Sequence, residues 1–166
     1  MRVGDLVDDF ELPDQTGTPR RLARLAATGP VVLFFYPAAF SPQCTVEHCR
    51  FRDTSEEFAS VGAQPVGISS DPIERQSRFA KRFRLGYVIL SDVDGAIGRR
   101  FDVERDFSIP WTRYRRHTYI IGPDRRILDI IRSEFRLTAH ANLALQFLRN
   151  NAYKATGRAH VPRHLG

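Results

Sequence analysis

Two cysteines lie five residues apart in a segment whose other residues suit thiol chemistry. Cys44 follows Pro37 and Ser41 closely, and Cys49 comes later in the same segment. If Cys44 lies in the first turn of a helix, unpaired backbone N–H groups and the helix dipole stabilise its thiolate. The thiolate is the nucleophilic form of a cysteine side chain. The sequence therefore predicts that Cys44 is a reactive nucleophile.

The elements on either side of Cys44 support this placement. Residues 31–36 form a continuous apolar run, rich in β-branched and aromatic residues, which predicts a buried strand that stops at Pro37. Residues 43–60 contain several glutamates and few helix breakers, and we expect them to form one helix. A strand followed at once by a helix would place Cys44 at the helix start.

The spacing of the two cysteines restricts how they could pair. On one helix they would be separated by about 7.5 Å along the axis and by about 140° around it. A disulfide needs Cα atoms within about 7 Å and converging side chains, so the pair could bond only if the helix unwound locally. From spacing alone, Cys44 and Cys49 could also be ordinary helix residues. A zinc site using His48 and His117 is a weaker alternative, because the chain has no Cys-x-x-Cys.

The remaining pattern predicts an α/β fold with a mixed central sheet flanked by helices, because parallel crossovers precede an antiparallel hairpin. The expected order begins with an N-terminal hairpin (9–12 and 19–22, with a turn at 14–17). After the strand and helix already described come a strand (65–69), a helix (73–83), a strand (87–90), a turn (92–95), a helix (96–101), a hairpin (117–121 and 127–131) and a closing helix (138–150). We expect one domain over residues 1–152 and a flexible basic tail over 153–166.

Composition limits the classes of partner. The chain has 166 residues and a net charge of +6, and only two of its 25 basic residues are lysines. The arginines are scattered along the chain instead of clustering with aromatic residues, so we expect no nucleic-acid partner. No run approaches the roughly 20 apolar residues of a membrane span, and the start of the chain lacks a signal-peptide core. We expect no membrane association and a cytoplasmic location.

Several blocks of the sequence resemble the peroxiredoxins. Pro37-x-x-x-Ser41-x-x-Cys44 is similar to the active-site motif of that family, Pro-x-x-x-Thr/Ser-x-x-Cys. The wider segment from residue 35 to 53 resembles the Q-type subfamily, also called bacterioferritin comigratory protein. Further matches fall in family order at residues 7–17, 67–71, 90–92 and 116–121. The resemblance implies a thioredoxin-like fold over roughly residues 3–150.

The resemblance also implies roles for individual residues. Cys44 would attack the peroxide and become a sulfenic acid, in a site completed by Pro37, Ser41 and Arg116. Pro37 would shield the thiolate, Ser41 would hydrogen-bond the peroxide, and Arg116 would lie beside the sulfur. Tyr36 and Phe40 could line the pocket or pack in the core, and Glu47 could serve the site or only the helix dipole. Arg113 and Arg115 are the alternatives to Arg116, and we expect His48 to be an exposed helix residue.

The implied activity is reduction of hydrogen peroxide and organic hydroperoxides without a metal or other cofactor. Cys49 matches a resolving cysteine that would form a disulfide with Cys44, to be reduced by thioredoxin or a similar dithiol. Three alternatives stay open: a one-cysteine peroxidase resolved by an external thiol, a redox-sensing interaction protein, and a general thiol–disulfide oxidoreductase. The lack of Cys-x-x-Cys disfavours the last. We expect a monomer or a weak homodimer.

Two features depart from the family pattern. Ser41 stands where threonine is more frequent, and its side chain is less restricted in rotamer because it lacks the extra methyl group. Residues 104–114, with Trp111, match no family block, although they lead to Arg116 and could shape the mouth of the site.

Overall fold

The computed structural model describes residues 1–105 and 113–151, so Trp111 and the predicted tail lie outside the described residues. The helices and strands, in chain order, are β1 (Glu11–Pro13), β2 (Pro19–Arg21), α1 (Leu22–Ala26), β3 (Val31–Phe35), α2 (Pro42–Asp53), α3 (Ser55–Ser60), β4 (Gln64–Ser69), α4 (Ile73–Phe83), β5 (Val88–Ser91), α5 (Ala96–Arg100), β6 (His117–Ile121), β7 (Ile127–Arg132) and α6 (Ala139–Asn150).

A mixed five-stranded sheet in the order β5-β4-β3-β6-β7 forms the centre of the molecule. β3, β4 and β5 are parallel, and β6 runs antiparallel to both β3 and β7. β1 and β2 form a separate antiparallel hairpin. The predicted α/β class, mixed sheet and N-terminal hairpin are therefore confirmed.

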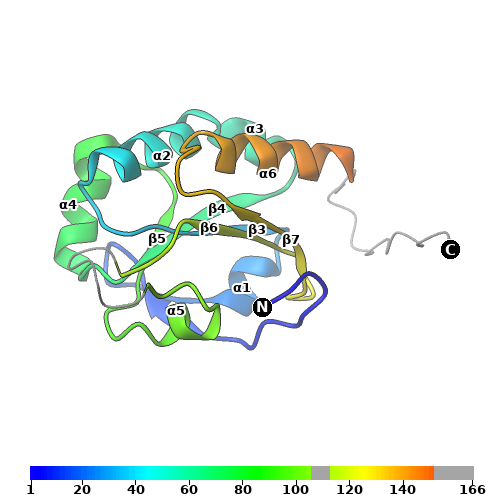
Figure 1. Cartoon of the computed structure of the whole chain (residues 1–166), viewed down its shortest axis with the longest axis horizontal. Helices are drawn as coiled ribbons and strands as arrows, with labels where there is room; N and C mark the ends of the chain where they lie inside the picture. Colours follow the sequence, from blue (N-terminus) through cyan, green and yellow to red (C-terminus); the bar gives the residue numbers. More distant parts are fainter. Residues whose placement is uncertain (106–112, 152–166) are drawn as a thin grey trace, which may run out of the picture.

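Helices cover both faces of this sheet (Figure 1). Alternate residues of β3 point to opposite faces, as the pleat of a strand requires. Val32 and Phe34 join the cluster beneath α2, α3, α4 and α6, whereas Val31, Leu33 and Phe35 join the cluster on the side of α1 and α5. Burial on both faces explains why the strand is an unbroken apolar run. Among the described residues, no helix is long and apolar enough to cross a membrane.

The expected single helix over 43–60 is wrong, because the structure has two helices separated at Thr54. The backbone of Thr54 leaves helical geometry (φ −103°, ψ 11°), and its hydroxyl donates to the carbonyl of Arg50. Such a bond lets a β-branched hydroxyl residue satisfy a carbonyl at a helix end. The short helix α1 was also missed, since the extended segment expected to reach Leu22 ends at Arg21.

Candidate active site

The loop between β3 and α2 is held by contacts from the segment that follows β4. The backbone N–H of Ala39 donates to Asp71 Oδ2 (2.7 Å), and Arg75 Nη2 donates to the carbonyl of Ala39 (2.8 Å). The next residue, Phe40, has a positive φ of 66°, which is uncommon for a residue with a side chain. Pro37 is buried at the start of the loop. The loop therefore has a fixed conformation where the chain enters α2.

Ser41 is the N-cap of α2 and Pro42 is its first residue. The Ser41 hydroxyl oxygen accepts a hydrogen bond from the backbone N–H of Cys44 (3.2 Å), which satisfies one of the free donors at the helix start. Proline fits the first helical position because it has no N–H to satisfy. Cys44 consequently lies in the first turn of α2, as predicted, and it is fully buried.

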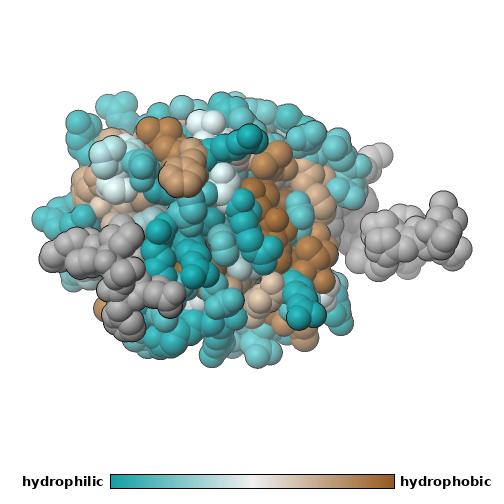
Figure 2. Space-filling view, in the orientation of Figure 1, coloured by the Kyte–Doolittle hydropathy of each residue, from teal (hydrophilic) through white to brown (hydrophobic). Residues whose placement is uncertain are grey.

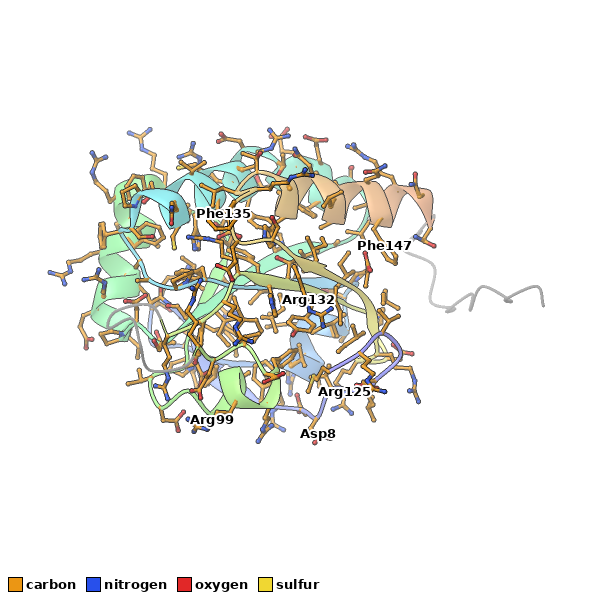
Figure 3. All side chains as sticks on the ribbon, viewed as in Figure 1. Asp8, Arg99, Arg125, Arg132, Phe135 and Phe147 are labelled. Atoms are coloured by element: carbon orange, nitrogen blue, oxygen red, sulfur yellow. The ribbon has the colours of Figure 1, made fainter. Side chains whose placement is uncertain are left out.

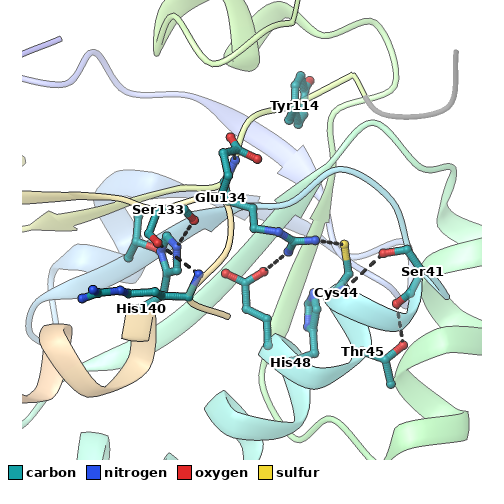
Figure 4. Close-up of polar contacts among 12 residues, drawn as sticks. Ser41, Cys44, Thr45, His48, Tyr114, Ser133, Glu134 and His140 are labelled. Carbon is teal, nitrogen blue, oxygen red and sulfur yellow. Dashed lines mark hydrogen bonds and ion pairs between the residues drawn. The ribbon is translucent and has the colours of Figure 1, made fainter. Parts of the chain in front are cut away.

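Arg116 reaches Cys44 from the residue that precedes β6. Its Nη2 lies 3.2 Å from Cys44 Sγ, while Nη1 forms an ion pair with the Glu47 carboxylate. Figure 4 shows these contacts with the Ser41 cap. Arg116 is 2% exposed and Glu47 is 0% exposed, so the three side chains form a group shielded from water. Of the three neighbouring arginines considered, Arg116 is the one that contacts the sulfur.

Burial and neighbouring charges shift the pKa values of Arg116 and Glu47 in opposite directions. Burial alone would lower the pKa of Arg116, but the charges of Glu47 and Cys44 raise it above its usual value, so the guanidinium stays protonated. Burial raises the pKa of Glu47 to about 7, although Arg116 acts to lower it. One oxygen of Glu47, Oε1, has no hydrogen-bond partner among the described residues. The cation of the site is therefore permanent, and the charge of Glu47 can change near neutral pH.

Glu134 fixes the backbone at Arg116, a role that the sequence did not reveal. Its Oε1 accepts from the backbone N–H of Arg116 (3.1 Å), and its other oxygen pairs with Arg105. Glu134 lies in the connection between β7 and α6, 18 residues after Arg116. Nothing in the local pattern around Glu134 could have indicated this contact, because it depends on how β6 and β7 pair.

His48 is buried, so the prediction of an exposed helix residue is wrong. Its ring lies among Phe34, Tyr36 and Phe79, and its Nδ1 is 2.7 Å from the hydroxyl of Tyr87. That hydroxyl also donates to the carbonyl of His48 (3.1 Å), which can only accept. Since a phenol has one proton, Nδ1 must be the donor of the first bond. Burial lowers the pKa of His48 to about 3, so the ring is neutral.

Cys44 and Cys49 lie on the same helix, α2, and both are free thiols. Cys44 is fully buried, whereas Cys49 is partly exposed. The C-terminal half of α2 is tied to its neighbours, because Arg50 donates to Asn142 of α6 and Arg52 donates to the carbonyl of Phe83 of α4. An intact helix keeps the two sulfurs on different faces. Any disulfide between them requires part of α2 to unwind.

Tyr36 and Phe40 make packing contacts in the structure. The hydroxyl of Tyr36 donates to the buried side chain of Gln76, and the ring of Phe40 packs edge-on against Phe79 of α4. Phe40 also lies under the guanidinium of Arg75 (5.6 Å), which helps to hold the loop. In residues 1–105 and 113–151, no group of three or more His, Cys, Asp or Glu side chains is arranged to hold a metal ion.

This fold and thiol site match one class of protein. Residues 3–130 match the AhpC/TSA family, and the chain belongs to that family. It is 32% identical over 155 residues to peroxiredoxin Bcp of Escherichia coli K12, covering 92% of this chain and 98% of that protein. It falls among the thiol peroxidases of the Bcp and peroxiredoxin Q type, as the sequence predicted.

Solved structures agree with this placement. The crystal structure of peroxidoxin BcpB from Mycobacterium tuberculosis has a TM-score of 0.86 at 53% identity, covering 90% of this chain and 97% of that one. The bacterioferritin comigratory protein of Xanthomonas campestris, described for its alkyl peroxide reduction activity, has a TM-score of 0.78 at 26% identity and covers 86% and 92%. The predicted thioredoxin-like fold is therefore confirmed.

Proposed function

We propose that this chain reduces hydrogen peroxide and small organic hydroperoxides at Cys44. The observation that carries the proposal is the position of Cys44 Sγ, buried in the first turn of α2 and 3.2 Å from Arg116 Nη2. The likeness to a protein described for alkyl peroxide reduction supports this class of substrate.

In the first step, the Cys44 thiolate attacks the terminal oxygen of the hydroperoxide. An S–O bond forms, the O–O bond breaks, and the displaced alkoxide or hydroxide takes up a proton to leave as alcohol or water. The sulfur is oxidised to a sulfenic acid. Negative charge develops on the leaving oxygen, where Arg116 and the hydroxyl of Ser41 supply donors that are already in place. Pro37 and the loop contacts of Asp71 exclude water from the thiolate.

In the second step, Cys49 attacks the sulfur of the sulfenic acid and water leaves. The product is a Cys44–Cys49 disulfide, which forms after α2 unwinds locally. A dithiol such as thioredoxin then reduces the disulfide through two exchanges, and its own thiols are oxidised to a disulfide. The partly exposed position of Cys49 supports this order, because a partner can reach its sulfur first. We further propose that the protein acts in the cytoplasm. We also propose that it is a monomer or weak homodimer, and sedimentation would test this oligomeric state.

The experiment is rapid mixing of reduced protein with one equivalent of hydrogen peroxide, followed by intact mass, with Cys44→Ser, Cys49→Ser and free cysteine in parallel. We expect consumption far faster than by free cysteine, lost in Cys44→Ser, and a wild-type product about 2 Da lighter. In Cys49→Ser the product should be a sulfenic acid, about 16 Da heavier. A stable sulfenic acid in the wild type would favour the one-cysteine mechanism, and a rate equal to that of free cysteine would refute the peroxidase function.

A further inference from the structure

A pocket lies on the face of the sheet opposite to Cys44. Its volume is about 580 Å³, and its lining comes from the chain start, the residues after α5, β6 with the segment before it, and the end of β7. Phe101 and Tyr119 belong to the hydrophobic cluster on the α1 and α5 side, whereas Cys44 belongs to the other cluster. None of the residues proposed for peroxide chemistry lines this pocket.

Positive charge predominates in the lining. Three arginines contribute to it, from the chain start (Arg2), the segment before β6 (Arg115) and the end of β7 (Arg132), against one carboxylate, Asp102. Within residues 1–105 and 113–151, none of these three arginines forms an ion pair. Many exposed arginines elsewhere on the molecule do pair with a carboxylate. Figure 3 places Arg132 near the centre of the viewed face, between α6 and α5. Three positive charges that line one pocket without an ion-pair partner in the described part of the chain favour an anion between them.

His117 adds a neutral donor or acceptor to the same pocket. It pairs with Arg132 across β6 and β7, and its ring lies on the side of Tyr119 (6.3 Å between centroids). Its Nδ1 is buried and has no hydrogen-bond partner among the described residues. Burial, followed by the charges of Arg132 and Arg115, lowers the pKa of His117 to about 4. A buried polar atom without a partner is costly unless a ligand or water satisfies it.

We propose that this pocket binds the phosphate group of inorganic phosphate or of a small phosphate ester. The three arginines come from separate segments and therefore approach a ligand from different directions. A tetrahedral dianion offers acceptor oxygens in several directions, whereas a single planar carboxylate offers them in one plane, and guanidinium groups form bidentate bonds to phosphate. Arg2 and Arg132 are exposed, so a polar ligand can reach them from solvent. The viewed face of the molecule carries hydrophilic residues beside a hydrophobic band (Figure 2).

The test is isothermal titration calorimetry of the reduced full-length protein with inorganic phosphate, pyrophosphate and ribose 5-phosphate, at ionic strength matched with sodium chloride. We expect saturable binding at one site for at least one of these probes. Tighter binding of ribose 5-phosphate than of the two inorganic anions assigns the site to a phosphate ester, and the reverse order assigns it to an inorganic phosphate. Arg132→Gln and Arg115→Gln should each weaken binding at least tenfold. Arg78→Gln, an exposed arginine on α4 outside the pocket, is the matched control and should bind as the wild type does.

A second measurement separates loss of the site from loss of the fold. The pKa of His117, followed by NMR in the wild type, should rise when the best probe is added, because the bound anion stabilises the imidazolium. Heats that do not saturate, equal affinity in Arg132→Gln, or an unchanged pKa of His117 would each overturn the proposal. Tighter binding of citrate than of pyrophosphate would overturn the assignment to phosphate. None of these readouts depends on peroxidase activity.

Discussion

At the scale of single residues, one guanidinium serves two buried groups at once. Arg116 donates through Nη2 to Cys44 and through Nη1 to Glu47. A planar fork can hold both contacts in one orientation, and the second contact fixes the direction of the first. Lysine would supply the same charge from a single rotatable nitrogen. The site therefore depends on the shape of the arginine side chain as well as on its charge.

Arg116→Lys should lower the second-order rate constant for hydrogen peroxide by about 100-fold, which is the usual effect of removing one preorganised donor. Arg113→Lys is the matched control, because Arg113 pairs with Glu104 at the surface and should leave the rate unchanged. Stopped-flow peroxide consumption measures both. A rate for Arg116→Lys within threefold of the wild type would show that charge alone suffices.

The oxygen of Ser41 caps α2, and under the proposed function its hydroxyl proton is free to donate to the substrate. Ser41→Ala should lose about 1 kcal/mol of unfolding free energy through the missing cap, as well as activity. Ser41→Thr should retain the cap and react at least as fast as the wild type, because threonine fixes the hydroxyl rotamer more strongly. Urea unfolding and stopped-flow rates test the two effects separately, and a slower Ser41→Thr would contradict the rotamer argument.

At the scale of elements, α2 must be stable enough to form the site and weak enough to unwind under the proposed cycle. His48 lies between the two cysteines in sequence, and its ring is buried against β3 and α4 with a bond to Tyr87. Unwinding the helix through this residue withdraws the ring from the core. Under the proposed cycle, we therefore expect the contact between His48 and Tyr87 to slow disulfide formation.

Tyr87→Phe should speed conversion of the Cys44 sulfenic acid to the disulfide by about fivefold, since each kcal/mol of weakened local structure is a factor of about 5. Quenched-flow intact mass follows the conversion. Tyr114→Phe is the control: it removes a comparable buried hydroxyl that bonds Asp92, but in the cluster on the other face of the sheet. If Tyr114→Phe accelerates resolution equally, global destabilisation explains the effect and the specific role of His48 is wrong.

The elements also show what local sequence can and cannot predict. β3 was predictable because burial on both faces leaves a continuous apolar run, and the first-turn position of Cys44 followed from Pro37 and the residues after it. His48 was misjudged because a histidine on a polar helix indicates the surface, while its partner Tyr87 is 39 residues away. The break at Thr54 was missed because no glycine or proline marks it. The contact of Glu134 with Arg116 likewise depends on tertiary packing.

At the scale of the whole molecule, three partly or fully buried histidines contribute to the response of stability to acid. Burial lowers the pKa of His48 to about 3, that of His117 to about 4, and that of His140 below its usual value. Below pH 6.5 the unfolded chain therefore binds more protons than the folded chain, and stability falls as pH falls. Glu47 acts in the opposite sense between about pH 4.5 and 7, because the folded state holds its proton more tightly.

The histidines outnumber this glutamate, so the unfolding free energy should decrease by on the order of 2 kcal/mol from pH 7 to pH 5, after allowance for the partial exposure of His117. His48→Asn should make the dependence shallower, since asparagine can replace Nδ1 in the bond to Tyr87 but does not titrate. Urea unfolding at several pH values gives the slope directly. A slope in His48→Asn that equals that of the wild type would mean that folding does not shift the pKa of His48.

Under the proposed cycle, α2 releases the buried ring of His48 before its cysteines can meet, and this requirement gives the oxidised Cys44 a finite lifetime. During that lifetime a second peroxide molecule competes with Cys49 and can convert the sulfenic acid to the sulfinic acid, which thioredoxin-type dithiols do not reverse. The ratio of the unwinding rate to the rate of this second oxidation defines a threshold dose of peroxide. Below that dose each molecule completes repeated catalytic cycles. Above it, Cys44 is oxidised to the sulfinic acid and the molecule is inactivated. Under the proposed cycle, we therefore expect the packing of His48 to affect how much peroxide the protein tolerates before it is inactivated.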